Sequence, residues 1–331
     1  MSDRPRVSVI ISAYNLEEFI GAAIESVLAQ TYSNVEVVVV DDGSTDGTAE
    51  VIDGYGSRII AIHQSNSGVC AARNAGIRAS SGELIGVLDG DDLWLPERVD
   101  RLVSFLEARP DLGMVTSDSW FMEGFEPTER RFYRGRSRRP FPVSEADQIP
   151  EIARFNFLFV GVVFRRELVE ECGMFTIGPR YGNRGSIESA EDLELWTRFL
   201  LSGARAGFVD EPLGYYRKRP GSLSRSPHQA LAHQTVLERY LPALWKQGAK
   251  GTARDSYEIG TRLAAFGDRR AALPFFLHAL TGEGARGSRI RYVTSSVRRL
   301  LKPAETEKGL YGDAPPAAPG ADDPTKVPER A

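Results

Sequence analysis

The sequence predicts an α/β fold, in which a mostly parallel, doubly wound sheet is flanked by helices and followed by a C-terminal helical extension. Short β-branched runs alternate with segments of helical apolar spacing as far as residue 108. Within the strand expected at 35–40, the run at 37–40 is apolar throughout, which is typical of a strand buried on both faces. Polar clusters follow several of the predicted strands, at the edge where such sheets bind ligands. This alternation predicts parallel neighbours joined by right-handed crossovers.

The same patterns place the individual elements. We expect strands at 7–11, 35–40, 59–63 and 84–88, and helices at 16–30, from 49, at 69–79 and at 96–108. The pattern loosens after 112–120, and farther on we expect strands at 160–164, 206–209 and 214–217, and a helix at 188–201. Residues 123–150 are rich in charges and prolines without a period, which predicts an excursion or a mobile loop.

These elements divide the chain into three predicted parts. An α/β domain covers 1–225, a helical appendage covers 226–302, and a disordered, proline-rich tail covers 303–331. Within the appendage, 267–280 resembles one helix of a tetratricopeptide-type hairpin. About three repeats are needed to bury a solenoid core, so one hairpin predicts no array.

Charge and cysteine content exclude several classes of protein. The 331 residues carry 41 basic and 45 acidic side chains, and the net charge of -4 gives no overall attraction to nucleic acid. Cys70 and Cys172 lack metal-ligand spacing, which is typical of reduced thiols in the cytosol. The N-terminal segment before the first predicted strand, residues 1–6, is short and polar, and no stretch of the sequence contains ~18 consecutive apolar residues. We therefore expect a cytoplasmic protein without a secretory signal, membrane span, zinc site or nucleic-acid partner.

The strongest chemical signal is the acidic run Asp89, Asp91 and Asp92 after the fourth predicted strand. Carboxylates so close together repel one another unless a cation or a network of donors compensates them. Hard oxygen ligands suit Mg²⁺ or Mn²⁺, so one interpretation is a divalent metal site. The other is a solvated acidic turn that caps the helix starting at Pro96. A second acidic turn nearby favours the metal site.

Two further residues near the strand ends leave alternatives open. Asp42 is placed to cap the helix that follows Asp46, or to accept hydrogen bonds from a base imino group or ribose hydroxyls. Tyr14 offers a ring face for stacking a nucleobase, or packs at a loop. For each residue, the sequence alone does not distinguish between its two possible roles.

An ordered series of motifs carries a family resemblance over roughly residues 5–225. It consists of VSVIISAYN at 7–15, AQTY at 29–32, DDGSTDGT at 41–48, NSG at 66–68, ARNAG at 72–76, LDGDD at 88–92, VFRRE at 163–167, GMF at 173–175, EDLELW at 191–196 and PLGYYR at 212–217. With these motifs the chain resembles the family 2 inverting glycosyltransferases of GT-A fold. The QxxRW signature of processive polysaccharide synthases is absent after Asp192, so transfer of one sugar per encounter is expected.

The resemblance implies a nucleotide-sugar site formed by the first half of the chain. Ser12, Tyr14 and Asp42 match positions that hold the nucleobase. Arg73 matches a position beside the nucleotide. The implied donor is a nucleotide-diphosphate sugar of UDP or dTDP type.

The resemblance also implies the residues of the chemical step. Asp89 and Asp91 match the DxD motif, in which the first carboxylate serves the ribose or donor sugar and the last ligates Mg²⁺ or Mn²⁺. Asp192 matches the catalytic base, and Glu191 and Trp196 match an acceptor or network position. The implied activity is inverting, metal-dependent sugar transfer to a hydroxyl of a glycan or lipid-linked acceptor, in the synthesis of cell-surface polysaccharide or glycoconjugates.

Other functions are weighed against this one. A sugar nucleotidyltransferase needs a glycine-rich loop after the first strand, and residues 12–16 contain no glycine. A dinucleotide oxidoreductase lacks its G-x-G-x-x-G motif for the same reason. A non-catalytic nucleotide-sugar-binding scaffold stays open as an alternative, although a scaffold has no need of Asp89, Asp91 and Asp192 together.

The chain departs from the family at one motif and adds two basic patches. Many relatives carry a histidine after the Tyr-Arg pair, whereas Lys218 and Arg219 stand here, and one or the other is expected to supply charge to the diphosphate. The arginine-rich loop 130–139 is either a solvated loop or a lid for an anionic acceptor. Segment 287–302 is an amphipathic basic helix, which either packs on its own domain or makes peripheral contact with the inner face of the membrane.

Overall fold

The computed structural model describes residues 4–133, 141, 144–154, 156–158, 161–177 and 189–219, together with eleven single positions between 232 and 277. The predicted appendage is therefore covered only at those positions, and the predicted tail lies outside the described residues. Segment 287–302, for which membrane contact is expected, also lies outside them. The same holds for the tetratricopeptide-like segment, except at three positions.

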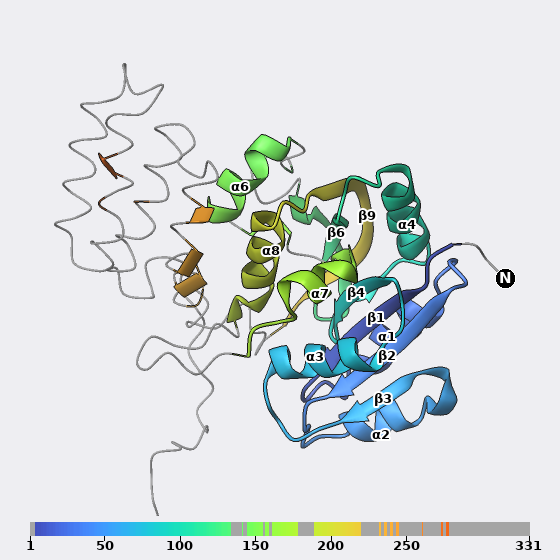
Figure 1. The fold of residues 1–331 in the computed structure, drawn as a ribbon. Helices are drawn as coiled ribbons and strands as arrows, with labels where there is room; N and C mark the ends of the chain where they lie inside the picture. The colour runs from blue at the N-terminus through green and yellow to red at the C-terminus, as the bar shows by residue number, and fades with distance from the viewer. Residues whose placement is uncertain are drawn as a thin grey trace, which may run out of the picture.

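The first half of the chain forms the parallel part of the sheet (Figure 1). Its strands are β1 (Val7–Ala13), β2 (Val35–Asp41), β3 (Ile60–His63) and β4 (Leu84–Asp89), in the order β3-β2-β1-β4 with every pair parallel. The connections contain α1 (Ile20–Leu28), α2 (Thr48–Asp53), the 3₁₀ turn η1 (Gly56–Arg58) and α3 (Val69–Ala79). The predicted alternation of strand and helix is confirmed, and α3 has the predicted bounds.

Alternate residues of β1 face two separate cores. Val9 and Ile11 pack with α1 on one face of the sheet, and Ile10 packs with α3 on the other. Because both faces are covered, the central strands have no polar alternation. The sheet is thus enclosed between helices, and its strand ends are the part left accessible to a ligand.

The described residues after β4 widen the sheet with strands of mixed orientation. They are β5 (Leu93–Trp94), β6 (Met114–Glu123), β7 (Glu126–Arg131), β8 (Val163–Arg165) and β9 (Ala206–Lys218), in the order β4-β8-β6-β9-β5 with β7 paired to β6. The helices are α4 (Arg98–Ala108), α6 (Glu145–Arg154), α7 (Glu167–Cys172) and α8 (Glu191–Leu201). β8 lies antiparallel between β4 and β6, whereas β6 and β9 are parallel. The pairing of β5 with β9 sets the acidic run beside the end of β9.

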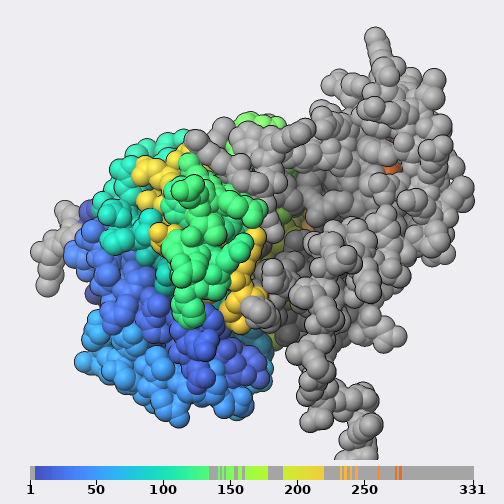
Figure 2. Space-filling view, turned by 180° about the vertical axis from the view of Figure 1, so that it is seen from behind, coloured from blue at the N-terminus to red at the C-terminus, as the bar shows by residue number. Residues whose placement is uncertain are grey.

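Of the excursion or mobile loop expected over 123–150, an irregular loop is wrong for the described part of that segment, which forms a strand and a helix. Gly124, with a φ of +59°, turns β6 back into β7, and α6 follows from Glu145. Figure 2 shows this hairpin (green) reaching the N-terminal residues (blue), where Phe125 stacks on Phe19 with ring centroids 5.2 Å apart. β7 is an edge strand with both faces largely exposed, so its sequence shows no apolar alternation.

Two other expectations change. The predicted strands at 206–209 and 214–217 are one continuous strand, β9, because its pairing with β6 shifts register near Asp118 and interrupts the apolar pattern without ending the strand. In the loop at 130–139, Arg131 belongs to β7 and pairs with Asp118 and Asp210, so its role is structural. Residues 134–139 lie outside the described part, and the proposal of a lid there stays a prediction. In the part of the chain that the structure describes, no helix is long and apolar enough to span a membrane.

Candidate functional site

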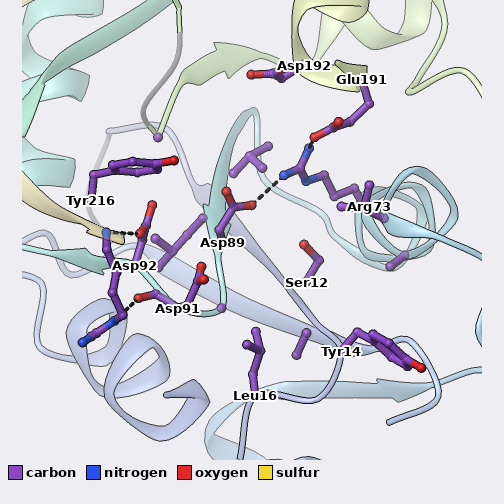
Figure 3. Close-up of a pocket in the computed structure, with 18 of the residues that line it drawn as sticks. Ser12, Tyr14, Leu16, Arg73, Asp89, Asp91, Asp92, Glu191, Asp192 and Tyr216 are labelled. Atoms are coloured by element: carbon purple, nitrogen blue, oxygen red, sulfur yellow. Dashed lines mark hydrogen bonds and ion pairs between the residues drawn. The ribbon is translucent and has the colours of Figure 1, made fainter. Parts of the chain in front are cut away.

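A pocket of about 500 Å³ opens at the carboxyl ends of the parallel strands and is closed on its far side by α8 and β9 (Figure 3). All nine residues singled out in the sequence line it: Ser12, Tyr14, Asp42, Arg73, Asp89, Asp91, Glu191, Asp192 and Trp196. They meet because β1, β2 and β4 are parallel and in register, so that Ser12 pairs with Asp89 across the strands. The roles of these residues stay predictions, but their convergence in one pocket is a property of the fold.

Asp42 is held rigidly at the end of β2. Its carboxylate accepts hydrogen bonds from Gln64 Nε2 at 2.6 Å, from the Ser67 backbone N–H at 2.9 Å and from the Gly68 backbone N–H at 2.8 Å. It does not cap α2, whose N-cap is Gly47 without a side-chain cap. The capping alternative is therefore wrong for Asp42. Tyr14, 47% exposed, stands at the rim of the pocket with its ring accessible for stacking.

The acidic run is compensated by arginines from β9 and the residue that follows it. Arg219 Nε lies 2.6 Å from Asp91 Oδ2, and the backbone N–H of Arg217 donates to Asp92 Oδ1 at 2.8 Å. Burial and repulsion from the neighbouring carboxylates raise the pKa of Asp91 and, more strongly, that of Asp92. No side chain caps α4, whose N-cap is Glu97. The run is thus a crowded group of carboxylates at the pocket wall, and the solvated capping turn is excluded.

A divalent cation fits this wall if a substrate completes its coordination. Within the described ranges no three His, Cys, Asp or Glu side chains are grouped to hold a metal unaided. Mg²⁺ is usually bound by one or two carboxylates together with substrate phosphates, so a smaller donor set suffices. Asp91 and the half-exposed Asp89 line the pocket and offer carboxylate oxygen of that kind.

Arg73 joins the two sides of the pocket (Figure 3). Its Nη2 lies 2.6 Å from Asp89 Oδ1 at the end of β4, and its Nη1 lies 2.7 Å from Glu191 Oε1 at the start of α8. The residue is only 5% exposed, and the guanidinium carbon lies 5.2 Å from the centroid of the Phe175 ring. Arg73 therefore connects carboxylates that are 102 residues apart in the sequence, from Asp89 to Glu191.

Asp192 lies in the first turn of α8 with both carboxylate oxygens hydrogen-bonded. Oδ1 accepts from its neighbour Leu193 N–H at 2.7 Å, and Oδ2 accepts from Asn156 Nδ2 at 2.7 Å. Burial raises the pKa of Asp192 to about 6, against the opposing charge of Arg73. Burial also raises the pKa of Glu191, although Arg73 acts in the other direction. Asp192 is thus ionised at neutral pH yet more basic than an ordinary carboxylate, as a general base requires.

Sequence reasoning missed several residues of the site. Asn156 belongs to no motif and contacts Asp192 from a segment 36 residues away. Arg217 was quoted only as part of a motif, yet its Nε donates to the Asp91 carbonyl oxygen and its guanidinium lies over the Phe19 ring. No spacing in the sequence signals these contacts, because each joins segments that are far apart along the chain and meet only in the folded protein. Of the two cations expected near the diphosphate, Arg219 lines the pocket, whereas Lys218 lies over the Phe121 ring.

Comparisons with known proteins agree with this geometry. The family model described as glycosyl transferase family 2 matches residues 8–173. The uncharacterized glycosyltransferase EpsJ of Bacillus subtilis (strain 168) is 30% identical over 251 residues, which cover 71% of this chain and 68% of that protein. The UDP-Glc:alpha-D-GlcNAc-diphosphoundecaprenol beta-1,3-glucosyltransferase WfaP of Escherichia coli is 28% identical over 233 residues, which cover 69% of this chain and 84% of that protein.

A solved structure shows the same architecture. The mannosyltransferase PcManGT from Pyrobaculum calidifontis, in complex with GDP-Man and Mn²⁺, aligns over 91% of this chain and 88% of that chain. The TM-score is 0.54 and the sequence identity is 21%. The curled sheet flanked by helices is accordingly a GT-A fold. This chain belongs to glycosyl transferase family 2.

Proposed function

We propose that the α/β domain, residues 1–225, transfers a sugar with inversion from a nucleotide-diphosphate donor to a hydroxyl of a glycan or lipid-linked acceptor. The observation that carries this proposal is the arrangement around Arg73, which links a carboxylate at the donor side, Asp89, to Glu191, the residue beside Asp192. Sugar transfer needs acidic groups in two places, one near the leaving diphosphate and one near the incoming hydroxyl. The pocket offers both.

The donor nucleotide occupies the end of the pocket formed by β1 and β2. Tyr14 stacks on the base, the Ser12 hydroxyl donates or accepts hydrogen bonds, and the Asp42 carboxylate accepts hydrogen bonds from the base and ribose. Asp42 suits this role because three donors hold it in one orientation before any ligand arrives. A UDP or dTDP sugar is the proposed donor, and the name of WfaP, which specifies UDP-Glc, supports the first.

The diphosphate lies against the acidic run and Arg219. Asp91 would hold a Mg²⁺ or Mn²⁺ ion, and Asp89 would serve the ribose or the donor sugar. Such an ion, when bound, stabilises the negative charge that develops on the leaving diphosphate. Arg219 lines the same wall and adds a second positive charge for the phosphate oxygens. The Mn²⁺ in the PcManGT complex supports a metal in this fold.

Asp192 takes the proton of the acceptor hydroxyl. The hydroxyl oxygen forms a bond to the anomeric carbon while the bond from that carbon to the diphosphate oxygen breaks, and the proton passes to the Asp192 carboxylate. Attack from the face opposite the leaving group inverts the anomeric configuration in one displacement. Glu191 and Trp196, which line the pocket beside Asp192, are proposed to contact the acceptor or to support the base.

The acceptor is proposed to be a growing cell-surface polysaccharide or glycoconjugate, carried as a glycan or on a lipid diphosphate. The name of WfaP specifies a lipid-linked acceptor, which supports this class. A reaction on a lipid-linked acceptor would take place at the inner face of the membrane. Peripheral contact through segment 287–302, outside the described residues, stays part of the proposal.

The proposal is tested by comparing Asp192→Asn with the wild type. Nucleotide binding is measured by calorimetry with Mn²⁺, and transfer is measured with a panel of nucleotide sugars. Asp192→Asn should bind nucleotide as the wild type does and lose transfer by about 10²-fold or more, because a general base typically contributes 10²–10⁴-fold. Asp111→Asn, at an exposed residue outside the pocket, is the matched control. Transfer that survives in Asp192→Asn would remove Asp192 from the role of base.

The wild-type protein alone separates the remaining alternatives. Nucleotide binding without transfer or hydrolysis of any nucleotide sugar would favour the non-catalytic scaffold. Failure to bind any nucleoside diphosphate, with or without Mn²⁺ or Mg²⁺, would refute the proposed function altogether. A thermal-shift panel makes the first distinction quickly, since stabilisation grows with saturation by the ligand.

A further inference from the structure

We propose that Asn156 is a positioning residue that holds the carboxylate of Asp192 in the orientation needed to receive a proton. This inference rests on the proposed function of Asp192 as the base. It concerns a residue outside every motif of the sequence, in the short segment between α6 and β8. The contacts of both side chains support it.

The amide of Asn156 can face Asp192 in only one way. Its Oδ1 accepts the backbone N–H of Leu158 at 3.2 Å, which commits the oxygen of the amide. The NH₂ group must then point to the other side, where Nδ2 donates to Asp192 Oδ2 at 2.7 Å. Asn156 is 7% exposed, so the packing around it and these two hydrogen bonds leave its side chain little freedom.

Two donors together fix the Asp192 carboxylate. The Leu193 N–H donates to Oδ1 from the same helix, and Asn156 donates to Oδ2 from a different part of the chain. The first contact alone leaves the side chain hinged on its own helix end, whereas the second anchors it to the wall formed by residues 156–158. A base whose lone pair already points to the reaction position avoids the cost of orienting it during the reaction.

Asn156 also favours the ionised form of the base. The charged groups that act on Asp192 are Arg73 from α3 and Asp89 from β4, and its titratable neighbour on α8 is Glu191, whose own pKa the charge of Asp192 raises. Arg73 favours the Asp192 carboxylate, and Asp89 and burial oppose it. A hydrogen bond donated by Asn156 to the carboxylate acts in the same direction as Arg73. Loss of that donor should therefore raise the pKa of the base as well as free its side chain.

Asn156→Asp is the sharpest variant because it has the shape of asparagine. It keeps an oxygen for the Leu158 N–H and replaces only the donor that faces Asp192 by an acceptor. We expect kcat at pH 7 to fall by roughly 30-fold. The acidic limb of the kcat–pH profile should move to higher pH by about one pH unit, while KM for the donor changes less than about twofold. A purely structural role would lower stability without moving the pH profile.

Asn34→Asp is the matched control. Asn34 precedes β2 at the end of the sheet away from the pocket, and its side chain contacts Arg6 and the Arg4 carbonyl oxygen. The exchange adds the same charge and should leave the kcat–pH profile unchanged. If Asn156→Asp fails to fold, Asn156→Ser and Asn156→Ala are compared instead, and the serine variant, which keeps a donor, should retain the higher kcat at pH 7.

The outcomes separate this inference from the function on which it rests. If Asp192→Asn loses transfer but Asn156→Asp keeps the wild-type pH profile and kcat, or if the serine and alanine variants are equally active, Asn156 has no positioning role. If Asp192→Asn retains transfer, the proposed base is wrong and this inference is overturned with it. Lower kcat with a shifted acidic limb in the Asn156 variants, and inactivity of Asp192→Asn, would support both.

Discussion

Asp91 and Arg219 form an ion pair at the wall of the pocket, with Arg219 Nε 2.6 Å from Asp91 Oδ2. Both side chains are largely buried, at 13% exposed for the carboxylate and 21% for the guanidinium. Arg219 also lies over the Phe19 ring, with its guanidinium carbon 5.5 Å from the ring centroid. Asp91, which we propose as the metal ligand, is therefore already paired with the positive charge of Arg219. A divalent cation has to share or displace that partner.

The first prediction is that Arg219→Gln binds Mn²⁺ more tightly in the absence of nucleotide. Removing the guanidinium frees Asp91 for the ion, and loss of an ion pair worth about 1 kcal/mol corresponds to roughly fivefold in affinity. Binding of a nucleoside diphosphate with Mn²⁺ should weaken at the same time, because a positive charge for the phosphates is lost. Calorimetry with Mn²⁺ alone and with UDP measures both.

Arg101→Gln serves as the control for this variant, since Arg101 pairs with Glu211 outside the pocket. It should leave both affinities unchanged. Weaker binding of Mn²⁺ alone to Arg219→Gln would mean that Arg219 supports the metal site and does not compete with the ion.

The second prediction concerns the pH dependence of transfer. Burial raises the pKa of Asp192 to about 6, and only the ionised carboxylate accepts a proton. The value of kcat should therefore be constant above pH ~7 and fall about tenfold per unit well below pH 6. Steady-state kinetics between pH 5 and pH 8 with saturating donor measure this limb. A rate that stays constant down to pH 5 would contradict the assignment of Asp192 as the base.

The third prediction is that Arg73 and Glu191 are strongly coupled in stability. Arg73→Met removes the cation that favours the ionised form of the buried Glu191, so that its carboxyl either takes up a proton or stays charged without a partner, and breaking a buried pair in this way costs about 3 kcal/mol. Glu191→Gln should cost less, because Arg73 keeps Asp89. In the double variant the unpaired charge is gone, so the two losses should fall short of additivity by more than about 1 kcal/mol. Urea unfolding at pH 7 gives the four free energies of unfolding.

The exposed pair Arg58–Glu25 provides the comparison for this cycle. Its side chains are more than half exposed, and the N···O distance is 3.1 Å. The same substitutions, Arg58→Met and Glu25→Gln, should be additive within about 0.5 kcal/mol, as is usual for surface ion pairs. Equal coupling at both sites would show that burial does not strengthen the Arg73 pair.

The parallel part of the fold could be predicted because its signals are local. Residues 37–40 of β2 are buried and form an uninterrupted apolar run, and α3 places Cys70, Ala72 and Ile77 at helical spacing on its buried face. The sequence of the edge strand β7 has no apolar alternation, and the apolar pattern of β9 is interrupted although the strand itself is continuous. β7 buries little of either face, and β9 continues through Asp210 and Pro212 because a register shift in its pairing with β6 accommodates them. Both depend on partners distant in the sequence.

The same distinction holds for the site. Asp42, Asp89 and Asp91 directly follow or end strands, so the carboxyl-end rule for parallel sheets predicts from local sequence alone that they lie together. Asn156 and Arg217 act through contacts with residues 36 and about 125 positions away, which no local period encodes. The residues that hold the predicted side chains in place, such as Asn156 and Arg217, are therefore identified only by the structure.

The fourth prediction tests the packing of α3 on β1, the contact that positions Arg73. A methyl group on Gly76 would clash with Ile10 Cγ2 of β1 and lie 3.3 Å from Val40 Cγ2 of β2. Gly76→Ala should therefore lower the free energy of unfolding by about 1–3 kcal/mol, although alanine favours the helix. Gly21→Ala in α1 is the matched control, because its methyl group meets only ordinary contacts at 3.6 Å and should leave stability unchanged or slightly raised. If both variants are equally stable in urea unfolding, α3 is free to shift on the sheet, and Arg73 is not held by that contact.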